Sequence, residues 1–234
     1  MQIRILIVNG SPRLKNNTGL LLERAAAGIQ KINGIELKSF SFAGKSFAGC
    51  RGTCYSYCGK NGCCVEKDNF NEFLGLFLWA DGIIWAVPTY HAGPPAQVKA
   101  VLDRLVNVIF SFTKGMIPRF NKACGVITHG SSEWGGQELT AQFMINSITQ
   151  LKCLTVAGDS PKTNMAVIGY APTWEPGSIA EDKTALAAAE TLGQRVAETA
   201  KIIQEGTLAI SGQLDERYYA KELIEKIHFP SEEG

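Results

Sequence analysis

The chain has 234 residues, enough for one large domain, and 45% of them are hydrophobic, as in an ordinary folded protein. Its 23 Lys and Arg residues nearly cancel its 22 Asp and Glu residues, and this net charge of +1 argues against nucleic acid as a partner. The longest apolar run, 73–80, is shorter than the roughly 18 residues of a membrane helix, and the start of the chain lacks the apolar length of a signal peptide. We therefore expect a cytoplasmic protein with no membrane partner.

Apolar runs rich in β-branched residues alternate with segments of helical periodicity along most of the chain. Strands are predicted over 3–8, 35–42, 82–87, 123–128 and 154–157, and helices over 18–32, 70–79, 96–109 and 137–150. The alternation is typical of an α/β fold whose parallel sheet carries helices on both faces. Such sheets bind ligands in the loops at the carboxyl ends of their strands, so we expect the chemistry there.

The final part of the chain is predicted to be helical. Ser178 and Glu181 have the spacing of a capping box, which predicts a helix running to about Glu205. Another amphipathic stretch, 214–227, lies beyond Gly206. We interpret 1–206 as one domain and 207–234 as a helical C-terminal arm, suited to oligomer contacts rather than to a second domain.

The loop over 10–19 joins the first predicted strand to the first predicted helix. A helix N-terminus offers unpaired N–H groups and about half a positive charge, which suits a phosphate group. Ser11, Asn17 and Thr18 would add side-chain donors, and Arg13 and Lys15 would add positive charge. Alternatively, the Asn and Thr side chains only cap the helix while Ser-Pro makes the turn, and the spacing alone favours neither interpretation.

Three separate loops resemble those of one family. The first strand followed by 10–13 and 17–18 resembles the G-S-P-R-x-x-G-N-T motif of the NAD(P)H-dependent FMN reductase family, of the flavodoxin-like superfamily, with Asn16 where the family usually has Gly. Residues 80–84, 88–90 and 97–104 match its second signature, and 128–136 match its Gly-rich third loop. The resemblance covers about 1–160 and implies a flavodoxin-like fold with a five-stranded parallel sheet.

The resemblance also implies a bound FMN. In the family the first loop holds the phosphate, the Pro-x-Tyr loop lies against the isoalloxazine ring, and the third loop completes the pocket. Backbone N–H groups of 88–92 and 130–136 are then expected to stabilise negative charge on the reduced ring. Carried onto this chain, the predicted FMN-binding residues are Ser11, Arg13, Asn16, Asn17, Thr18, Pro88, Thr89, Tyr90, His91, Ala92, Thr128, His129, Gly130, Gly135 and Gly136.

Because FMN itself carries the chemistry in such proteins, no side-chain acid or base is required. His91, directly after the Pro-Thr-Tyr loop, is the one candidate for a proton donor to a reduced substrate, and simple solvation of a loop histidine is the alternative. Tyr90 and Trp134 are candidates for stacking on the ring or covering it, with ordinary packing as the alternative.

Five of the seven cysteines lie within 50–64, in an insertion that we place at about 44–69 after the second strand. Clustered thiolates suit zinc or an iron–sulfur cluster, because both need several soft ligands at one point. The segment resembles that of the iron–sulfur flavoproteins, a branch of the same family in which four cysteines hold a 4Fe–4S cluster that passes electrons to FMN. The predicted ligands are Cys50, Cys54, Cys58 and Cys64, with Cys63 as the alternative fourth ligand.

The cysteine spacing departs from that branch, which has two residues between its first cysteines where this chain has three in each gap. A helix would bring the first three cysteines to one face, but Gly52 and Gly59 disfavour a stable helix. Zinc, a thiol–disulfide pair and the absence of any ligand therefore remain alternatives to a cluster. Cys124 and Cys153 lie in predicted strands, where we expect them to be small buried hydrophobic residues.

The resemblance implies an FMN-dependent oxidoreductase that takes electrons from NAD(P)H and passes them to a quinone, a flavin or another small acceptor. One alternative is an iron–sulfur flavoprotein that exchanges electrons with a ferredoxin-type protein. Another is a non-enzymatic flavodoxin-fold module with a structural zinc site. The resemblance further implies a homodimer or homotetramer with the flavin near a subunit interface.

Overall fold

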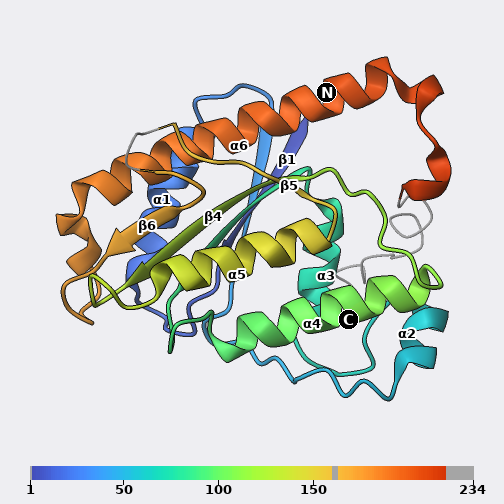
Figure 1. Cartoon of the computed structure of the whole chain (residues 1–234), viewed down its shortest axis with the longest axis horizontal. Coiled ribbons are helices and arrows are strands. Elements are labelled where there is room, and N and C mark those ends of the chain that lie inside the picture. The colour runs from blue at the N-terminus through green and yellow to red at the C-terminus, as the bar shows by residue number, and fades with distance from the viewer. Residues whose placement is uncertain (1, 160–162, 220–234) are drawn as a thin grey trace, which may run out of the picture.

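The computed structural model describes residues 2–159 and 163–219. A parallel sheet runs through the centre of the molecule with helices on both faces (Figure 1). Its strands lie in the order β2-β1-β3-β4-β5, with β6 also paired to β4. Their bounds are β1 Ile3–Asn9, β2 Ile35–Ser41, β3 Gly82–Pro88, β4 Ala123–Gly130, β5 Leu154–Thr155 and β6 Val167–Tyr170.

The predicted α/β architecture and its five parallel strands are confirmed, and the sequence missed one strand. β5 has only two residues and pairs with the start of β4, at Ala123 and Cys124. β6 pairs with the rest of β4, from Ile127 to Gly130. The two short strands therefore divide one edge of β4 between them, and the loop after β6 joins the other loops at the carboxyl ends of the strands.

The helices follow the predicted order with one addition. They are α1 Asn17–Ile29, α2 Tyr55–Asn61, α3 Phe70–Trp79, α4 Ala96–Phe112, α5 Gln137–Gln150 and α6 Lys183–Ala209. α1 and α6 pack on one face of the sheet, and α3, α4 and α5 pack on the other. None of the described helices is long and apolar enough to cross a bilayer.

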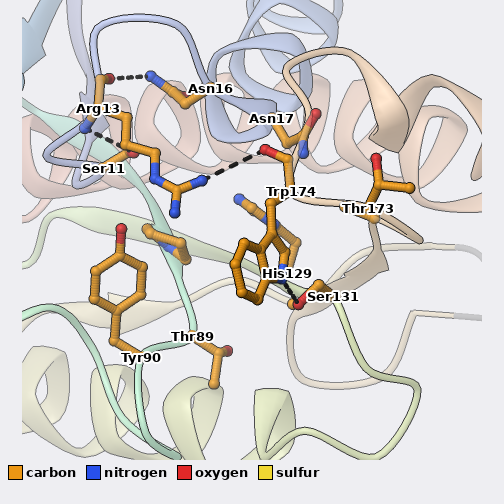
Figure 2. Close-up of a pocket in the computed structure, with 13 residues that line it drawn as sticks. Ser11, Arg13, Asn16, Asn17, Thr89, Tyr90, His129, Ser131, Thr173 and Trp174 are labelled. Atoms are coloured by element: carbon orange, nitrogen blue, oxygen red, sulfur yellow. Dashed lines mark hydrogen bonds between the residues drawn. The ribbon is translucent and has the colours of Figure 1, made fainter.

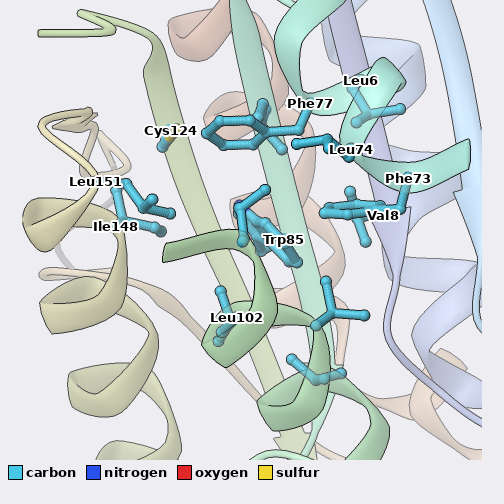
Figure 3. Close-up of a cluster of buried hydrophobic side chains, with 14 of the residues drawn as sticks. Leu6, Val8, Phe73, Leu74, Phe77, Trp85, Leu102, Cys124, Ile148 and Leu151 are labelled. Carbon is cyan, nitrogen blue, oxygen red and sulfur yellow. The ribbon is translucent and has the colours of Figure 1, made fainter. Parts of the chain in front are cut away.

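Strand periodicity explains the two layers of core. Along β1, Ile3 and Ile5 face α1 and α6, whereas Leu6 and Val8 face the other layer. The larger cluster surrounds Trp85, whose side chain lies in the sheet core as expected, and Figure 3 shows it between side chains of α3, α4 and α5. This closely packed layer carries the base of the cysteine-containing insertion.

Two local predictions were wrong. The segment of the insertion expected not to be helical forms α2, which packs against α4. Gly59 permits this approach, because a Cβ there would lie 3.1 Å from the carbonyl oxygen of Ser111. The proposed capping box also fails: Ser178–Glu181 forms a 3₁₀ turn, and Asp182 caps α6 by accepting a 2.9 Å hydrogen bond from the Ala185 N–H.

The predicted C-terminal arm is described only in part. α6 continues past the proposed boundary to Ala209, and two short 3₁₀ turns follow, Ser211–Gln213 and Glu216–Tyr218. The Arg119 N–H donates to the Tyr218 carbonyl oxygen at 2.7 Å, which ties the arm to the segment before β4. Residues 220–234, including most of the predicted amphipathic stretch, lie outside the described residues.

Candidate functional site

Four loops meet at the carboxyl ends of β1, β3, β4 and β6 and enclose a cavity of about 180 Å³ (Figure 2). Nine of the residues predicted to bind FMN line it. The complete lining is Ser11, Arg13, Asn16, Asn17, Pro88, Thr89, Tyr90, His129, Gly130, Ser131, Ala171, Thr173 and Trp174. The three loops chosen from the sequence therefore form one site, and the loop after β6 supplies a wall that was not predicted.

The first loop is shaped by Asn16, the residue that replaces the usual glycine. Its side-chain oxygen accepts hydrogen bonds from the Gly19 N–H at 2.7 Å and from the Asn9 amide at 3.2 Å. Its amide group donates to the Arg13 carbonyl oxygen at 2.6 Å. Asn16 is thus the N-cap of α1. As in any helix, the first N–H groups of α1 have no partners inside the helix.

Asn17 and Thr18 attach the first loop to its neighbours. The Asn17 amide donates to the Glu175 carbonyl oxygen at 3.2 Å, and its side-chain oxygen accepts from the Gly177 N–H at 2.8 Å. The fully buried Thr18 hydroxyl lies 2.8 Å from His129 Nε2. Both side chains hold loops together, so the donors that remain in the first loop come mainly from its backbone and from Arg13.

Two buried polar atoms in the cavity wall have no partner among the described residues, His129 Nδ1 and Thr89 Oγ1. Buried polar atoms in folded proteins almost always form hydrogen bonds, so these two are suited to a polar ligand. Burial, and secondarily the positive charge of Arg13, lowers the pKa of His129 to about 4. The imidazole is therefore neutral near pH 7, with one ring nitrogen on Thr18 and the other free to bind.

The second loop has a strained backbone. His91 and Ala92 have positive φ values, 48° and 59°. They form the turn between Tyr90 and Gly93, which pair in a β-bridge. Such conformations are costly for residues with a side chain and persist where the surroundings hold them. Gly136 supplies that support, because a Cβ on it would lie 2.9 Å from the Ala92 Cα. Ala92 and Gly136 therefore shape the site without lining the cavity, while His91 is exposed outside it.

The third loop is held by a residue that the sequence did not single out. Gln137, at the start of α5, is 2% exposed, and its amide donates to the Ser132 carbonyl oxygen at 2.5 Å. Its side-chain oxygen accepts from the Gly135 N–H at 2.9 Å, and its carbonyl oxygen accepts from the Thr128 hydroxyl at 3.3 Å. Thr128 and Gly135 thus support this loop rather than line the cavity. Trp134 is 86% exposed beside it.

A second, much smaller cavity of about 10 Å³ lies in the insertion. The four cysteines predicted as ligands all line it, together with Arg104 of α4. Burial, then the neighbouring Cys54 and Cys64 thiols, raises the pKa of Cys58 to about 11. Cys63 is not in this lining and lies beside Tyr57, whose pKa it raises.

The cysteines of the described chain are all free thiols. Cys124 and Cys153 are buried, as expected, and lie next to each other within the core. In the described residues no group of three or more His, Cys, Asp and Glu side chains has the spacing of a formed metal site. The four thiols of the insertion therefore share one cavity but lie in the arrangement of packed side chains rather than of metal ligands.

The sequence model of the family described as NADPH-dependent FMN reductase matches residues 3–164. The chain belongs to this family. The predicted resemblance to this family is thereby confirmed, and membership supports an FMN-dependent oxidoreductase.

Several proteins similar to this chain are named iron–sulfur flavoproteins. One from Methanocaldococcus jannaschii is 32% identical over 203 residues, which covers 87% of this chain and 100% of the relative. One from Archaeoglobus fulgidus is 32% identical over 164 residues, 69% of this chain and 79% of the relative. Among solved structures, an FMN-dependent NADH-azoreductase from Bacillus anthracis in complex with FMN has a TM-score of 0.57 at 14% identity, covering 83% of this chain and 99% of that one, and supports the flavodoxin-like fold.

For a member of the FMN reductase family, the most informative unpredicted residue is Trp174, on the loop after β6. Its indole N–H donates to the Ser131 hydroxyl at 3.0 Å, and its carbonyl oxygen accepts from the Arg13 guanidinium at 3.4 Å. Figure 2 shows Tyr90 and Trp174 extending into the same cavity from different loops. The Trp-Glu-Pro-Gly sequence at 174–177 has turn character, and this was the one signal that could have drawn attention to the loop.

Proposed function

We propose that this chain binds FMN in the cavity at the carboxyl ends of the strands and a 4Fe–4S cluster at Cys50, Cys54, Cys58 and Cys64, and passes electrons between them. The observation that carries the cluster is the selective convergence of these four cysteines on one cavity, which excludes their neighbour Cys63. The relatives named iron–sulfur flavoproteins support the same assignment.

The cavity residues suit the parts of FMN in different ways. The N-terminus of α1 and the Arg13 guanidinium provide N–H donors and positive charge for the phosphate. His129 Nδ1 and the Thr89 hydroxyl offer hydrogen bonds to polar ring atoms, and the neutral imidazole can donate or accept. Tyr90 and Trp174 provide aromatic surface. When bound, FMN supplies a centre that exchanges electrons singly or in pairs.

The thiols suit an iron–sulfur cluster in number and chemical type, since such clusters take four cysteine thiolates. The cavity has a volume of only about 10 Å³, so the four side chains must separate to admit a cluster. Their thiols must also lose their protons to act as ligands. Cys58 and Cys64 start from buried positions, whereas Cys50 is exposed on the insertion. We therefore expect cluster binding to reorganise the insertion and to leave the flavin cavity, which is already open, unchanged.

The electron donor and acceptor form a second part of the proposal. The family description favours NADPH as donor. NADH as an alternative donor, and a quinone, a flavin or another small molecule as acceptor, stay predictions. The cysteine cavity favours a ferredoxin-type protein as exchange partner. His91 stays a candidate proton donor from its exposed position, and assembly as a homodimer or homotetramer stays a prediction that light scattering would test.

The deciding experiment is anaerobic purification followed by a visible spectrum and by flavin, iron, sulfide and zinc determination. FMN near one per chain with about four iron and four sulfide per chain supports the proposal. Flavin without iron would leave a plain FMN reductase, and zinc without flavin would support the structural module instead. Reduction of the bound flavin is then followed separately with NADPH, NADH and a reduced ferredoxin, which distinguishes the donors.

A further inference from the structure

A buried ion pair lies where the two ends of the cysteine segment meet. Ala48 precedes the first cysteine and Asp68 follows the last. The Arg104 guanidinium binds both Asp68 oxygens, at 2.6 and 2.9 Å, and donates to the Ala48 carbonyl oxygen at 3.2 Å. Asp68 also accepts from the Ala48 N–H at 2.8 Å. Two hydrogen bonds between Ser46 and Asn69 join the same two ends just outside these residues. Arg104 of α4 is therefore the side chain that binds both ends of the segment containing all five clustered cysteines.

Arg104 also faces the thiols. Its side chain is 1% exposed, its guanidinium lies 4.2 Å from the centre of the Phe70 ring, and it lines the cavity of the four cysteines. Its Nε is buried without a hydrogen-bond partner in the described part of the chain. One donor of a buried cation is thus left over at this cavity.

The other cation at the cavity is different in kind. Arg51 is 65% exposed and pairs with Glu66 at 2.6 Å, so its charge is largely screened by solvent. Arg104 is held in place by a bidentate pair and cannot turn away into water. An anionic group in the cavity would therefore interact mainly with Arg104, since buried charges require paired or hydrogen-bonded counterparts.

We propose that Arg104 is the positioning residue of the cysteine site, closing the segment through Asp68 and placing its charge against the thiolates of the cluster. The inference rests on the proposed cluster and adds a residue outside the cysteine segment that controls its assembly and its reduction potential. Reduction adds negative charge to the cluster, so a fixed cation favours the reduced form and raises the potential. The Asp68 carboxylate acts in the opposite direction.

The test compares Arg104→Gln and Asp68→Asn, with Arg51→Gln as the matched control at the same cavity. Each protein is reconstituted anaerobically with iron and sulfide, and cluster content and midpoint potential are measured by redox titration with electron paramagnetic resonance. We expect a several-fold loss of cluster in both variants, a lower potential in Arg104→Gln and a higher potential in Asp68→Asn. Arg51→Gln should resemble wild type.

Potential shifts of opposite sign in Arg104→Gln and Asp68→Asn would separate an effect of charge from a purely structural one. A purely structural clamp would reduce cluster content in both variants, but the shift in potential would not follow the sign of the charge removed. Shifts of equal sign, or wild-type content and potential in Arg104→Gln, would overturn the inference. The FMN stoichiometry of each variant shows whether it has folded. If Arg104→Gln fails to fold, Arg104→Lys, which retains the charge, is measured in its place.

A second measurement uses the cluster-free protein. If Arg104 closes the segment, alkylation of Cys58 and Cys64 under native conditions should be several-fold faster in Arg104→Gln than in Arg51→Gln. Equal rates would refute the clamp. A wild-type chain that takes up no cluster would instead refute the cluster itself and with it the role of the Arg104 charge, so the two failures are distinguishable.

Discussion

The flavin cavity and the cysteine cavity are built in opposite ways. The first lies among loops anchored at strand ends, has a volume of about 180 Å³, and contains buried polar atoms that have no partner within 2–159 and 163–219. The second lies in an insertion, has a volume of about 10 Å³, and is filled by the thiols themselves. Hydrogen bonds from Asn17 and Thr18 join different loops of the first cavity. At the second cavity, the ends of the cysteine segment meet at the buried pair of Arg104 with Asp68.

This difference indicates that the flavin site is preorganised for its ligand and the cysteine site is not. A preformed site loses little conformational entropy when its ligand binds, whereas a site that must open spends part of the binding free energy on rearrangement. FMN should therefore bind to a chain that has no cluster. Uptake of the cluster, in turn, need not depend on bound FMN. Variants that change one cavity and leave the other intact can break or sharpen this comparison.

The largest expected effect is loss of the cluster on changing one buried ligand candidate. Cys58→Ser removes a thiol that lines the cavity, so reconstituted iron should fall to near background while FMN stays near one per chain. Cys63→Ser is the matched control, because Cys63 lies outside the lining beside Tyr57. Iron and flavin determination on both variants checks this. Cluster loss in Cys63→Ser with retention in Cys58→Ser would reverse the ligand assignment.

A pH effect on stability should come from the flavin cavity through His129. Its pKa is lowered to about 4 in the folded chain, against about 6.5 for an unfolded histidine. Between these values the unfolded chain binds a proton that the folded chain does not, so stability falls as the pH decreases from about 6.5 towards 4. At pH 5 the loss relative to pH 7 should be about 2 kcal/mol from this group.

Urea unfolding of the FMN-free protein at pH 7 and pH 5 measures this loss. His129→Gln should remove about 2 kcal/mol of the pH dependence, because no imidazole is left to protonate. His91→Gln, at an exposed loop position, is the control and should retain the wild-type dependence. An unchanged pH dependence in His129→Gln would show that His129 is not held in its neutral form by burial.

How far the sequence predicts the molecule depends on how local each signal is. The α3 bounds, 70–79, follow from side-chain periodicity and match the structure. β6 has only four residues and becomes a strand because β5 leaves most of the β4 edge unpaired. α2 likewise forms although Gly59 has a low helix propensity, since it packs on α4.

The site shows the same division. Motif spacing brought nine lining residues together from three loops. The binding partners of Asn17, however, lie about 160 residues away along the chain, on the loop after β6, and this contact has no signal in local spacing. The same holds for Arg104, whose role depends on the ends of an insertion 36 and 56 residues distant. Long-range pairs of this kind require the folded structure.

A smaller effect is expected from the contact between the second and third loops. Gly136 has φ +87°, and an added Cβ would lie 2.9 Å from the Ala92 Cα, so Gly136→Ala should displace the strained second loop. We expect FMN affinity to fall about tenfold, the equivalent of about 1.4 kcal/mol, without change in cluster content. Gly115→Ala controls for backbone strain, because Gly115 has φ +100° after α4 and its Cβ would meet only an ordinary contact. Equal affinities in both variants would show that the loop contact does not shape the flavin site.

The smallest expected effect concerns the wall that the sequence missed. Trp174→Phe keeps an aromatic ring but removes the 3.0 Å hydrogen bond to Ser131, as does Ser131→Ala from the other side. A hydrogen bond at an exposed position contributes on the order of 0.5–1 kcal/mol, so each variant should bind FMN about threefold more weakly. Because both remove the same bond, the double variant should be no weaker than either single one. Fluorescence titration with FMN measures all three. Effects that simply add would mean that Ser131 does not position Trp174, and that the loop after β6 acts on the flavin by some other contact.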